Sequence, residues 1–259
     1  MKKFVWILLF TLLAGCDMEP DKEPQAPQLL IYCGITMAHP IKEIAAIVEK
    51  QKNVKILITQ GGSEDLYRSL ALSHKGDLYL PGSASYRKRH IEEGLLGGYV
   101  EVGYNQLAMM VRKGNPRKLK NDLKELLRKD IAVVIGNADS GSVGRESKRV
   151  LEAAGIYDQV LDNTVYLTTD SRNLNRALRE HEADVILNWR ATAFFDENRE
   201  AMEVIDLDPK LAAPKQLLLN QLVFSGYPEE SRYFMEFAAS DEGQAIFRKY
   251  GFLDNQTRF

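Results

Sequence analysis

Apolar and polar positions follow two recurring patterns along most of the chain. Short apolar runs bounded by turn residues predict strands at 29–33, 54–59, 77–80, 106–111, 131–135, 165–167 and 184–188. Apolar residues spaced three or four apart predict helices at 40–50, 64–73, 119–128, 142–154, 173–181 and 229–250. Because strands and helices alternate nearly throughout, the pattern predicts an α/β fold with mostly parallel strands.

Three of the predicted strand-to-helix junctions carry small or hydroxylated residues. They are CGITMAHP at 33–40, QGGSED at 60–65 and NADSGSVGRES at 137–147. In open α/β sheets such junctions lie at the carboxyl ends of strands, where ligands bind, and each helix start offers unpaired N–H groups. One such junction is most simply an ordinary turn with a helix cap. Three with the same character predict a shared anion site.

The first 28 residues read as a targeting segment followed by a tether. Lys2 and Lys3 precede an apolar run at 4–13, which is too short for a good membrane span. The stretch LLAGC, which ends at Cys16, resembles the lipobox of bacterial lipoproteins. This resemblance implies a signal peptide at 1–15, a lipid on Cys16 and retention at the periplasmic side of the inner membrane. Residues 16–28 then form the lipidated cysteine and a proline-rich tether.

Composition narrows the classes of function. The 259 residues carry a formal net charge of −2, and they contain no basic tract that would suggest nucleic-acid binding. Only two cysteines occur, and if Cys16 carries lipid then Cys33 is left without a disulfide partner. We therefore expect Cys33 to be a small buried residue in a fold that is held together by packing.

Motifs for catalysis or metal binding are incomplete. Residues 136–142 nearly match a P-loop, but Ser142 stands where that motif needs a lysine. The four histidines occur singly, so a zinc site is not expected. Neither Ser63 nor Ser142 sits in a G-x-S-x-G pattern, and no base is assigned to either. We therefore expect a protein that is not an enzyme and that needs no cofactor or metal.

Seven segments after the tether resemble a known family in chain order. They are IYCGITMAHPIKEIAAIVEK, ILITQGGSEDLYRSL, GDLYLPGSASYRKRHIEEGLL, NQLAMMVRKGNPRKL, IAVVIGNADSGSVGRESKRVLEAAGIYDQV, NLNRALREHEADVILNWRATA and FMEFAASDEGQAIFRKYGF. Together they resemble the molybdate-binding family of periplasmic solute-binding proteins. The resemblance implies a two-lobed periplasmic-binding-protein fold of type 2 with a hinge of two crossing segments. It places lobe I at 29–103 plus 209–259 and lobe II at 104–208.

The resemblance also implies a ligand, a binding site and partners. A tetrahedral oxyanion, molybdate or tungstate, would lie in the cleft between the lobes and be held by uncharged hydroxyl and N–H donors. Carried over residue by residue, the site comprises Thr36 and Ser63 from lobe I, and Ser142, Val143, Leu174 and Trp189 from lobe II. The implied partners are an ABC-transporter permease and, through the lipid, the membrane, and we expect a monomer.

Two departures from the family at the predicted site leave the ligand open. Ser142 replaces a typical proline, and Trp189 replaces a tyrosine, exchanging an O–H for an indole N–H that donates but does not accept. Phosphate, phosphonate, a sulfate-like anion or a small carboxylate therefore stay possible ligands. A tethered sensor of such an anion and an enzyme on the same two-lobed scaffold are the alternative functions.

Three charged residues also lie close to the predicted site. Glu64 and Asp65 follow Ser63 at the first turn of a helix, where they complement the helix dipole, so we expect their side chains to face solvent. Facing the cleft, either would repel molybdate. We expect Arg190 to form a structural ion pair, although an arginine in the cleft would broaden the ligands to carboxylates or phosphonates.

Overall fold

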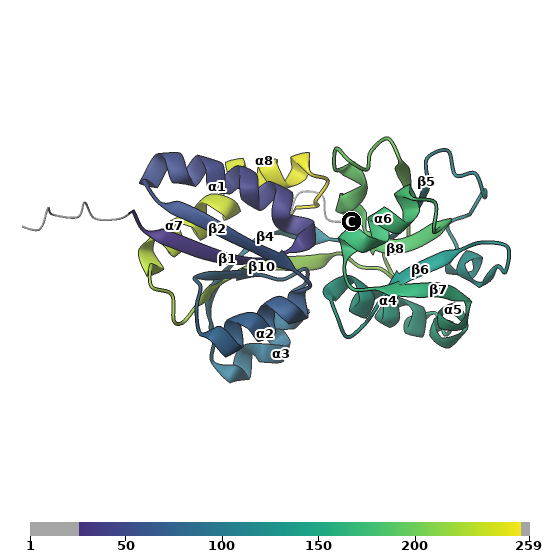
Figure 1. The fold of residues 1–259 in the computed structure, drawn as a ribbon, viewed down its shortest axis with the longest axis horizontal. Coiled ribbons are helices and arrows are strands. Elements are labelled where there is room, and N and C mark those ends of the chain that lie inside the picture. Colours follow the sequence, from purple (N-terminus) through teal and green to yellow (C-terminus); the bar gives the residue numbers. More distant parts are fainter. Residues whose placement is uncertain (1–25, 255–259) are drawn as a thin grey trace, which may run out of the picture.

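Two five-stranded sheets form the centres of two α/β lobes in the computed structural model, which describes residues 26–254 (Figure 1). The predicted signal peptide, Cys16 and most of the tether lie outside the described residues. Within residues 26–254, no helix combines the length and the apolar character that crossing a bilayer requires.

The first sheet has the strand order β2-β1-β3-β10-β4. Its strands are β1 (Gln28–Gly34), β2 (Lys55–Gly61), β3 (Leu78–Leu80), β4 (Leu96–Asn105) and β10 (Lys215–Leu222). In the same lobe lie α1 (Ala38–Lys52), α2 (Ser63–Ser73), α3 (Ser85–His90), α7 (Pro228–Ala239) and α8 (Asp241–Lys249) (Figure 1). Short 3₁₀ segments η1 (Ile35–Met37) and η2 (Ile91–Glu93) complete it.

The second sheet has the strand order β7-β6-β8-β5-β9. Its strands are β5 (Leu107–Arg112), β6 (Val133–Gly136), β7 (Thr164–Thr168), β8 (Val185–Trp189) and β9 (Met202–Asp206). This lobe contains α4 (Ser142–Ala153), α5 (Tyr157–Asn163) and α6 (Ser171–Arg179), with 3₁₀ segments η3 (Leu123–Leu127) and η4 (Arg190–Phe194).

Both sheets are mixed, so the prediction of mostly parallel strands was wrong. In the first sheet β1 is parallel to β2 and β3, but β10 runs antiparallel to β3 and β4. In the second, β6 is parallel to β7 and β8, but β5 runs antiparallel to β8 and β9. The antiparallel strands are those at which the chain enters or leaves a lobe.

The chain passes between the two lobes twice. Strand β4 of the first sheet ends at Asn105, and β5 of the second sheet begins at Leu107. Strand β9 of the second sheet ends at Asp206, and β10 of the first sheet begins at Lys215. The predicted fold class, a two-lobed α/β protein with two crossing segments, is therefore confirmed.

Each lobe has its own hydrophobic core. Met109 and Met110 are fully buried in the core of the second lobe, as expected for residues of a central strand. In the first lobe, the predicted apolar face of α1 is buried against the sheet together with Phe234 of α7. Cys33 is fully buried in the same core, and burial raises the pKa of its thiol. It is thus the small buried residue that the sequence predicted.

Two predicted helices differ from those observed. The prediction at 119–128 reduces to η3, because Asp122 accepts a hydrogen bond from the backbone N–H of Lys124 and starts a new turn there. The predicted helix at 229–250 breaks at Ser240, whose side chain caps α8 by accepting from the N–H of Gly243. In both cases a residue that prefers helix caps interrupts a continuous apolar pattern.

Candidate functional site

A small cavity lies between the lobes where the three predicted junctions meet. It has a volume of about 20 Å³ and is lined from the first lobe by residues near Thr36, by the Gly61–Gly62–Ser63 turn and by Gly82. The second lobe contributes residues 141–143, at the start of α4, and 169–171, at the start of α6. We call this space the inner cavity. It brings together Thr36, Ser63, Ser142 and Val143, four of the six residues that the resemblance gives for the site.

The serine hydroxyls of the inner cavity are held as hydrogen-bond acceptors. Ser63 Oγ accepts from the backbone N–H of Gly82 at 3.0 Å, and Ser142 Oγ accepts from Trp189 Nε1 at 3.3 Å. A hydroxyl has one proton to donate besides its two lone pairs. Each serine therefore keeps its own proton available for an anion in the cavity.

A direct hydrogen bond joins the two lobes at the edge of the inner cavity. Thr36 Oγ1, in η1, donates to Ser171 Oγ, the first residue of α6, at 3.3 Å. Both side chains are buried. Sequence reasoning missed Ser171, because the predicted helix began two residues too late. Asp170 could have shown the correct start of this helix, because its carboxylate caps α6 by accepting from the N–H groups of Arg172 and Asn173.

The two predicted backbone donors of the second lobe have different positions. Val143 belongs to the first turn of α4, where N–H groups have no acceptor within the helix, and it lines the inner cavity. Leu174 does not line the cavity. Its N–H donates to the carbonyl of Asp170 inside α6, and its side chain is buried in the core. The start of α6 at the cavity is Ser171 instead.

Two glycines allow the lobes to approach this closely. A Cβ atom on Gly62 would lie 2.7 Å from the carbonyl oxygen of Ser140, in the opposite lobe. A Cβ atom on Gly82 would lie 2.2 Å from Ser142 Oγ, also across the cleft. At Gly62 the opposing atom belongs to the backbone, so any side chain there would push the lobes apart, whereas a side chain at Gly82 would force the Ser142 hydroxyl to rotate away. The GGS motif thus serves close contact between backbones.

Trp189 acts on the cavity through Ser142. It ends β8, only 1% of it is exposed, and it does not itself line the cavity. Its indole N–H orients the Ser142 hydroxyl. Arg190, the next residue, forms an ion pair with Asp206 at 2.9 Å, which confirms the predicted structural role.

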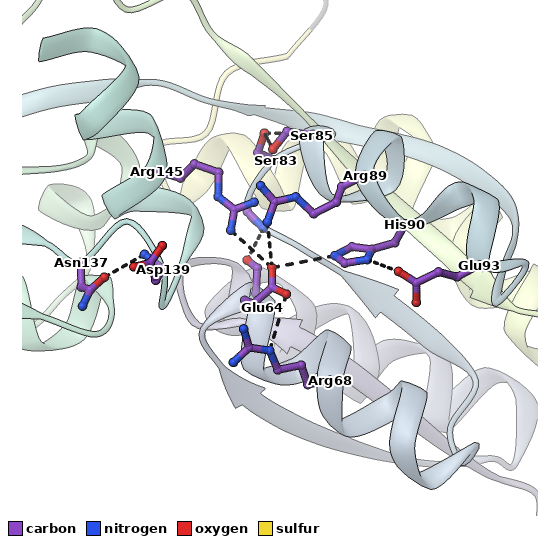
Figure 2. A network of polar contacts seen from close by, with 12 residues as sticks. Glu64, Arg68, Ser83, Ser85, Arg89, His90, Glu93, Asn137, Asp139 and Arg145 are labelled. Carbon is purple, nitrogen blue, oxygen red and sulfur yellow. Dashed lines mark hydrogen bonds and ion pairs between the residues drawn. The ribbon is translucent and has the colours of Figure 1, made fainter. Parts of the chain in front are cut away.

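Glu64 is buried, so the prediction that its side chain faces solvent was wrong. It lies beside the inner cavity in a group that we call the Glu64 cluster: Glu64, Arg68, Arg89, His90 and Arg145 (Figure 2). Glu64 Oε2 lies 3.3 Å from both Arg89 Nη1 and Arg145 Nη2. Arginines thus provide the charge and hydrogen bonds that burial of a carboxylate requires. Asp65 is exposed, as predicted.

Arg145 makes the Glu64 cluster a contact between the lobes. It lies on α4, one turn after Ser142, whereas Glu64, Arg68, Arg89 and His90 belong to the first lobe (Figure 2). Its guanidinium also lies over the ring of Tyr86, 4.7 Å from the ring centre. Burial raises the pKa of Tyr86 to about 12, although the nearby Arg145 acts in the opposite direction.

His90 connects the Glu64 cluster to Glu93. His90 Nδ1 lies 2.6 Å from Glu93 Oε1, and Tyr67 donates to the other oxygen of Glu93 at 3.0 Å. The contact with His90, and then that with Tyr67, hold the pKa of Glu93 below its usual value of 4.5.

Within residues 26–254, no group of His, Cys, Asp and Glu side chains is arranged to hold a metal ion.

Comparison with known proteins identifies the family to which the chain belongs. The family model described as bacterial extracellular solute-binding protein matches residues 29–253. A candidate binding protein of Haemophilus influenzae is 23% identical over 229 residues, which cover 88% of this chain and 92% of that protein. A candidate substrate-binding lipoprotein of an ABC transporter, YvgL of Bacillus subtilis, is 22% identical over 249 residues, 94% of each chain.

A solved structure shows the same two-lobed fold. It is the substrate-binding domain of a candidate molybdenum ABC transporter from Clostridium difficile, with a TM-score of 0.67 and 21% identity. The alignment covers 88% of this chain and 99% of that one. The predicted resemblance is therefore confirmed for family and fold, and this protein belongs to the bacterial extracellular solute-binding proteins.

Proposed function

We propose that this protein captures a tetrahedral oxyanion in the inner cavity and delivers it to an ABC importer. Molybdate and tungstate are the simplest such ligands. The observation that carries the proposal is the convergence of uncharged hydroxyls from both lobes, Thr36, Ser63 and Ser142, on one cavity. The names of the B. subtilis relative and of the C. difficile structure, both from ABC transporters, are consistent with it.

The arrangement of donors favours an anion without protons. Ser63 and Ser142 each use a lone pair to accept from Gly82 or Trp189, and each keeps a proton to donate. A fully ionised oxyanion needs donors only, and each donor is worth more in a cavity shielded from water. The carboxylate of Asp170 also borders the cavity, but it accepts from two N–H groups of α6. Hydrogen phosphate, which must donate a proton, is therefore less well matched.

We propose that binding closes the lobes about the two links between them. The lobes would comprise 29–103 plus 209–259 and 104–208, and the change of sheet between β4 and β5 and between β9 and β10 supports this division. Closure would add Ser142, Val143 and Ser171 to the donors of the first lobe. The permease would then meet a shape that exists mainly with ligand bound. We propose a monomer, and no catalytic step.

We also propose that a lipid on Cys16 anchors the protein at the periplasmic side of the inner membrane. The motif LLAGC supports this, and the B. subtilis relative is named as a lipoprotein. Mass spectrometry of the mature chain tests it: we expect a lipidated N-terminal Cys16, and a chain that begins elsewhere would contradict the proposal.

Thermal unfolding of the full chain in detergent, with molybdate, tungstate, sulfate and phosphate, tests the ligand. An anion present at a hundredfold excess over its dissociation constant should stabilise the protein by about 2.7 kcal/mol. Replacing Thr36 or Ser63 by alanine should weaken binding by about 1–3 kcal/mol, since Ser63 is a donor to a buried charge and Thr36 becomes one when the ligand displaces its bond to Ser171. Ser69→Ala, an exposed position on α2, is the matched control. Lack of stabilisation by every anion, or full affinity in both variants, would refute the proposal.

A further inference from the structure

A second, larger cavity adjoins the inner one between the lobes. Its volume is about 250 Å³, and its lining includes Ile35, Thr36 and Ser171, which also line the inner cavity. The hydrogen bond from Thr36 to Ser171 therefore lies on the boundary between the two spaces. We call the larger space the outer cavity. A ligand that displaces this bond could extend from one space into the other.

Positive charge predominates in the outer cavity. Lys42 of α1 and Arg172 and Arg179 of α6 line it, and none of the three contacts a carboxylate among the described residues. The acidic residue of the lining, Glu197, lies 3.4 Å from His39 Nε2. Arginine pairs in a planar, two-pronged fashion with carboxylates. Three uncompensated cations therefore favour an anionic group here.

An amide N–H of the same lining is open to the cavity. Asn175 lines the outer cavity and is only 4% exposed. Its Oδ1 accepts from Asn188 Nδ2 at 2.8 Å and from Thr192 Oγ1 at 3.2 Å, which fixes the orientation of the amide. Its Nδ2 donates to no acceptor within residues 26–254. Because Nδ2 is open to the cavity, it can donate to a ligand there in place of water.

We infer that the outer cavity is an anion subsite that binds a carboxylate attached to the oxyanion. The protein would then also take ligands in which a tetrahedral dianion, such as a phosphate monoester, carries a short chain ending in a carboxylate. Lys42 and Arg172 approach the carboxylate from opposite lobes, so such a ligand would hold both lobes together. The inference rests on the proposed function, because the inner cavity must receive the tetrahedral group.

Calorimetric titration of the full chain in detergent with 2-phosphoglycolate and with ethyl phosphate tests the subsite. Both are phosphate monoesters, and only the first has a carboxylate. We expect phosphoglycolate to bind at least about tenfold more tightly, the effect of one charge-assisted contact. Lys42→Gln and Arg172→Gln should each lower this ratio of affinities by about threefold or more, and the double variant should bring it close to one. The ratio cancels any effect on folding or closure that is common to both ligands.

Matched controls lie on the same helices. Lys50→Gln on α1 and Arg176→Gln on α6 remove the same charge from exposed positions outside the cavity lining, and both should keep the ratio of the parent. Equal affinities for the two esters in the parent, or a ratio unchanged in the double variant, would overturn the subsite. If molybdate, tungstate and both esters all fail to bind the parent, the proposed function itself fails and the subsite with it. Binding of bare oxyanions without any benefit from the carboxylate refutes the subsite alone.

Discussion

Ser63 and Glu64 are consecutive residues, yet they belong to two very different contacts between the lobes. Ser63 faces the inner cavity, where hydroxyls, backbone groups and glycines of both lobes meet. Glu64 lies in a cluster of arginines, one of which, Arg145, comes from the opposite lobe. One contact is built from uncharged donors and the other from full charges.

The difference shows how a chain with a net charge of −2 can offer a site for an anion. Oriented dipoles at helix starts and hydroxyls set the local field, so the total charge does not decide it. Arg68, Arg89 and Arg145 compensate the negative charge of Glu64. This carboxylate therefore does not repel an anion in the neighbouring cavity. Charged contacts thus hold the structure beside the cavity, and neutral donors remain free inside it.

The largest expected effect is on the Glu64 cluster. Glu64→Gln keeps the size of the side chain but leaves Arg68, Arg89 and Arg145 without the carboxylate that they share. Removing one partner from a buried ion pair costs about 3–5 kcal/mol, and because Arg68 and Arg89 are largely exposed we expect about 2–4 kcal/mol of folding free energy here. Thermal unfolding of the protein without ligand should show a lower midpoint, by on the order of 10 °C.

The neighbouring residue provides the control for this substitution. Asp65→Asn removes the same charge one position later, where the side chain is exposed, and should cost at most about 1 kcal/mol. A similar loss in both variants would mean that the effect comes from the helix dipole and not from the arginines. An unchanged midpoint in Glu64→Gln would show that the cluster contributes no stability.

The second largest expected effect is a loss of ligand affinity when the contact between the lobes at the inner cavity is disturbed. Gly62→Ala places a Cβ atom 2.7 Å from the carbonyl oxygen of Ser140 and so prevents the lobes from meeting at the inner cavity. We expect affinity for the best oxyanion to fall about tenfold to a hundredfold, or 1.4–2.8 kcal/mol. The midpoint of unfolding without ligand should fall less than in Glu64→Gln, since the backbone of Gly62 is extended and accepts alanine and only the contacts between the lobes are lost.

Gly98→Ala is the control for Gly62→Ala. Gly98 lies in β4, and a Cβ atom there would meet nothing within 4 Å. Its variant should bind like the parent in the same calorimetric titration. If Gly62→Ala also binds like the parent, the ligand does not need the close contact of the two backbones seen here.

Much of the fold could be predicted because the spacing of apolar residues and the residue types at strand-to-helix junctions can be read from short stretches of sequence. The apolar face of α1 and the strand β1 follow directly from residue spacing. Strand β4 was missed because its sequence LGGYVEVGYN contains three glycines, which weaken a strand pattern. Strands β9 and β10 were missed because the antiparallel return of the chain depends on contacts between residues far apart in sequence, which a local pattern does not contain.

In the candidate site, too, local features were predicted and features that depend on distant residues were missed. The resemblance to the family gave the hydroxyls and the start of α4, at junctions where small and hydroxylated residues also mark helix starts. It placed Leu174 one turn too far into α6, because the helix boundary depends on Asp170 as the cap. Sequence reasoning put the side chain of Glu64 in solvent, because the arginines that surround it come from α2, α3 and α4. Burial of a charge depends on partners that the local sequence does not reveal.

The smallest expected effect is a pH dependence of folding stability that comes from Glu93, the partner of His90. The pKa of Glu93 is held below its usual value of 4.5 by His90 and Tyr67. A carboxyl whose pKa is lower in the folded than in the unfolded protein stabilises the fold above the unfolded value, and this contribution is lost as the pH falls through the folded value. Because Glu93 is about half exposed, we expect less than about 0.5 kcal/mol. Between pH 7 and pH 3 the unfolding midpoint should therefore fall slightly less in Glu93→Gln than in the parent. The parent should be slightly more stable at pH 7, and this advantage should shrink only below pH 4.5. If the two proteins have the same midpoint at pH 7, or if the difference between them stays constant down to pH 3, the protonation of Glu93 is not linked to stability.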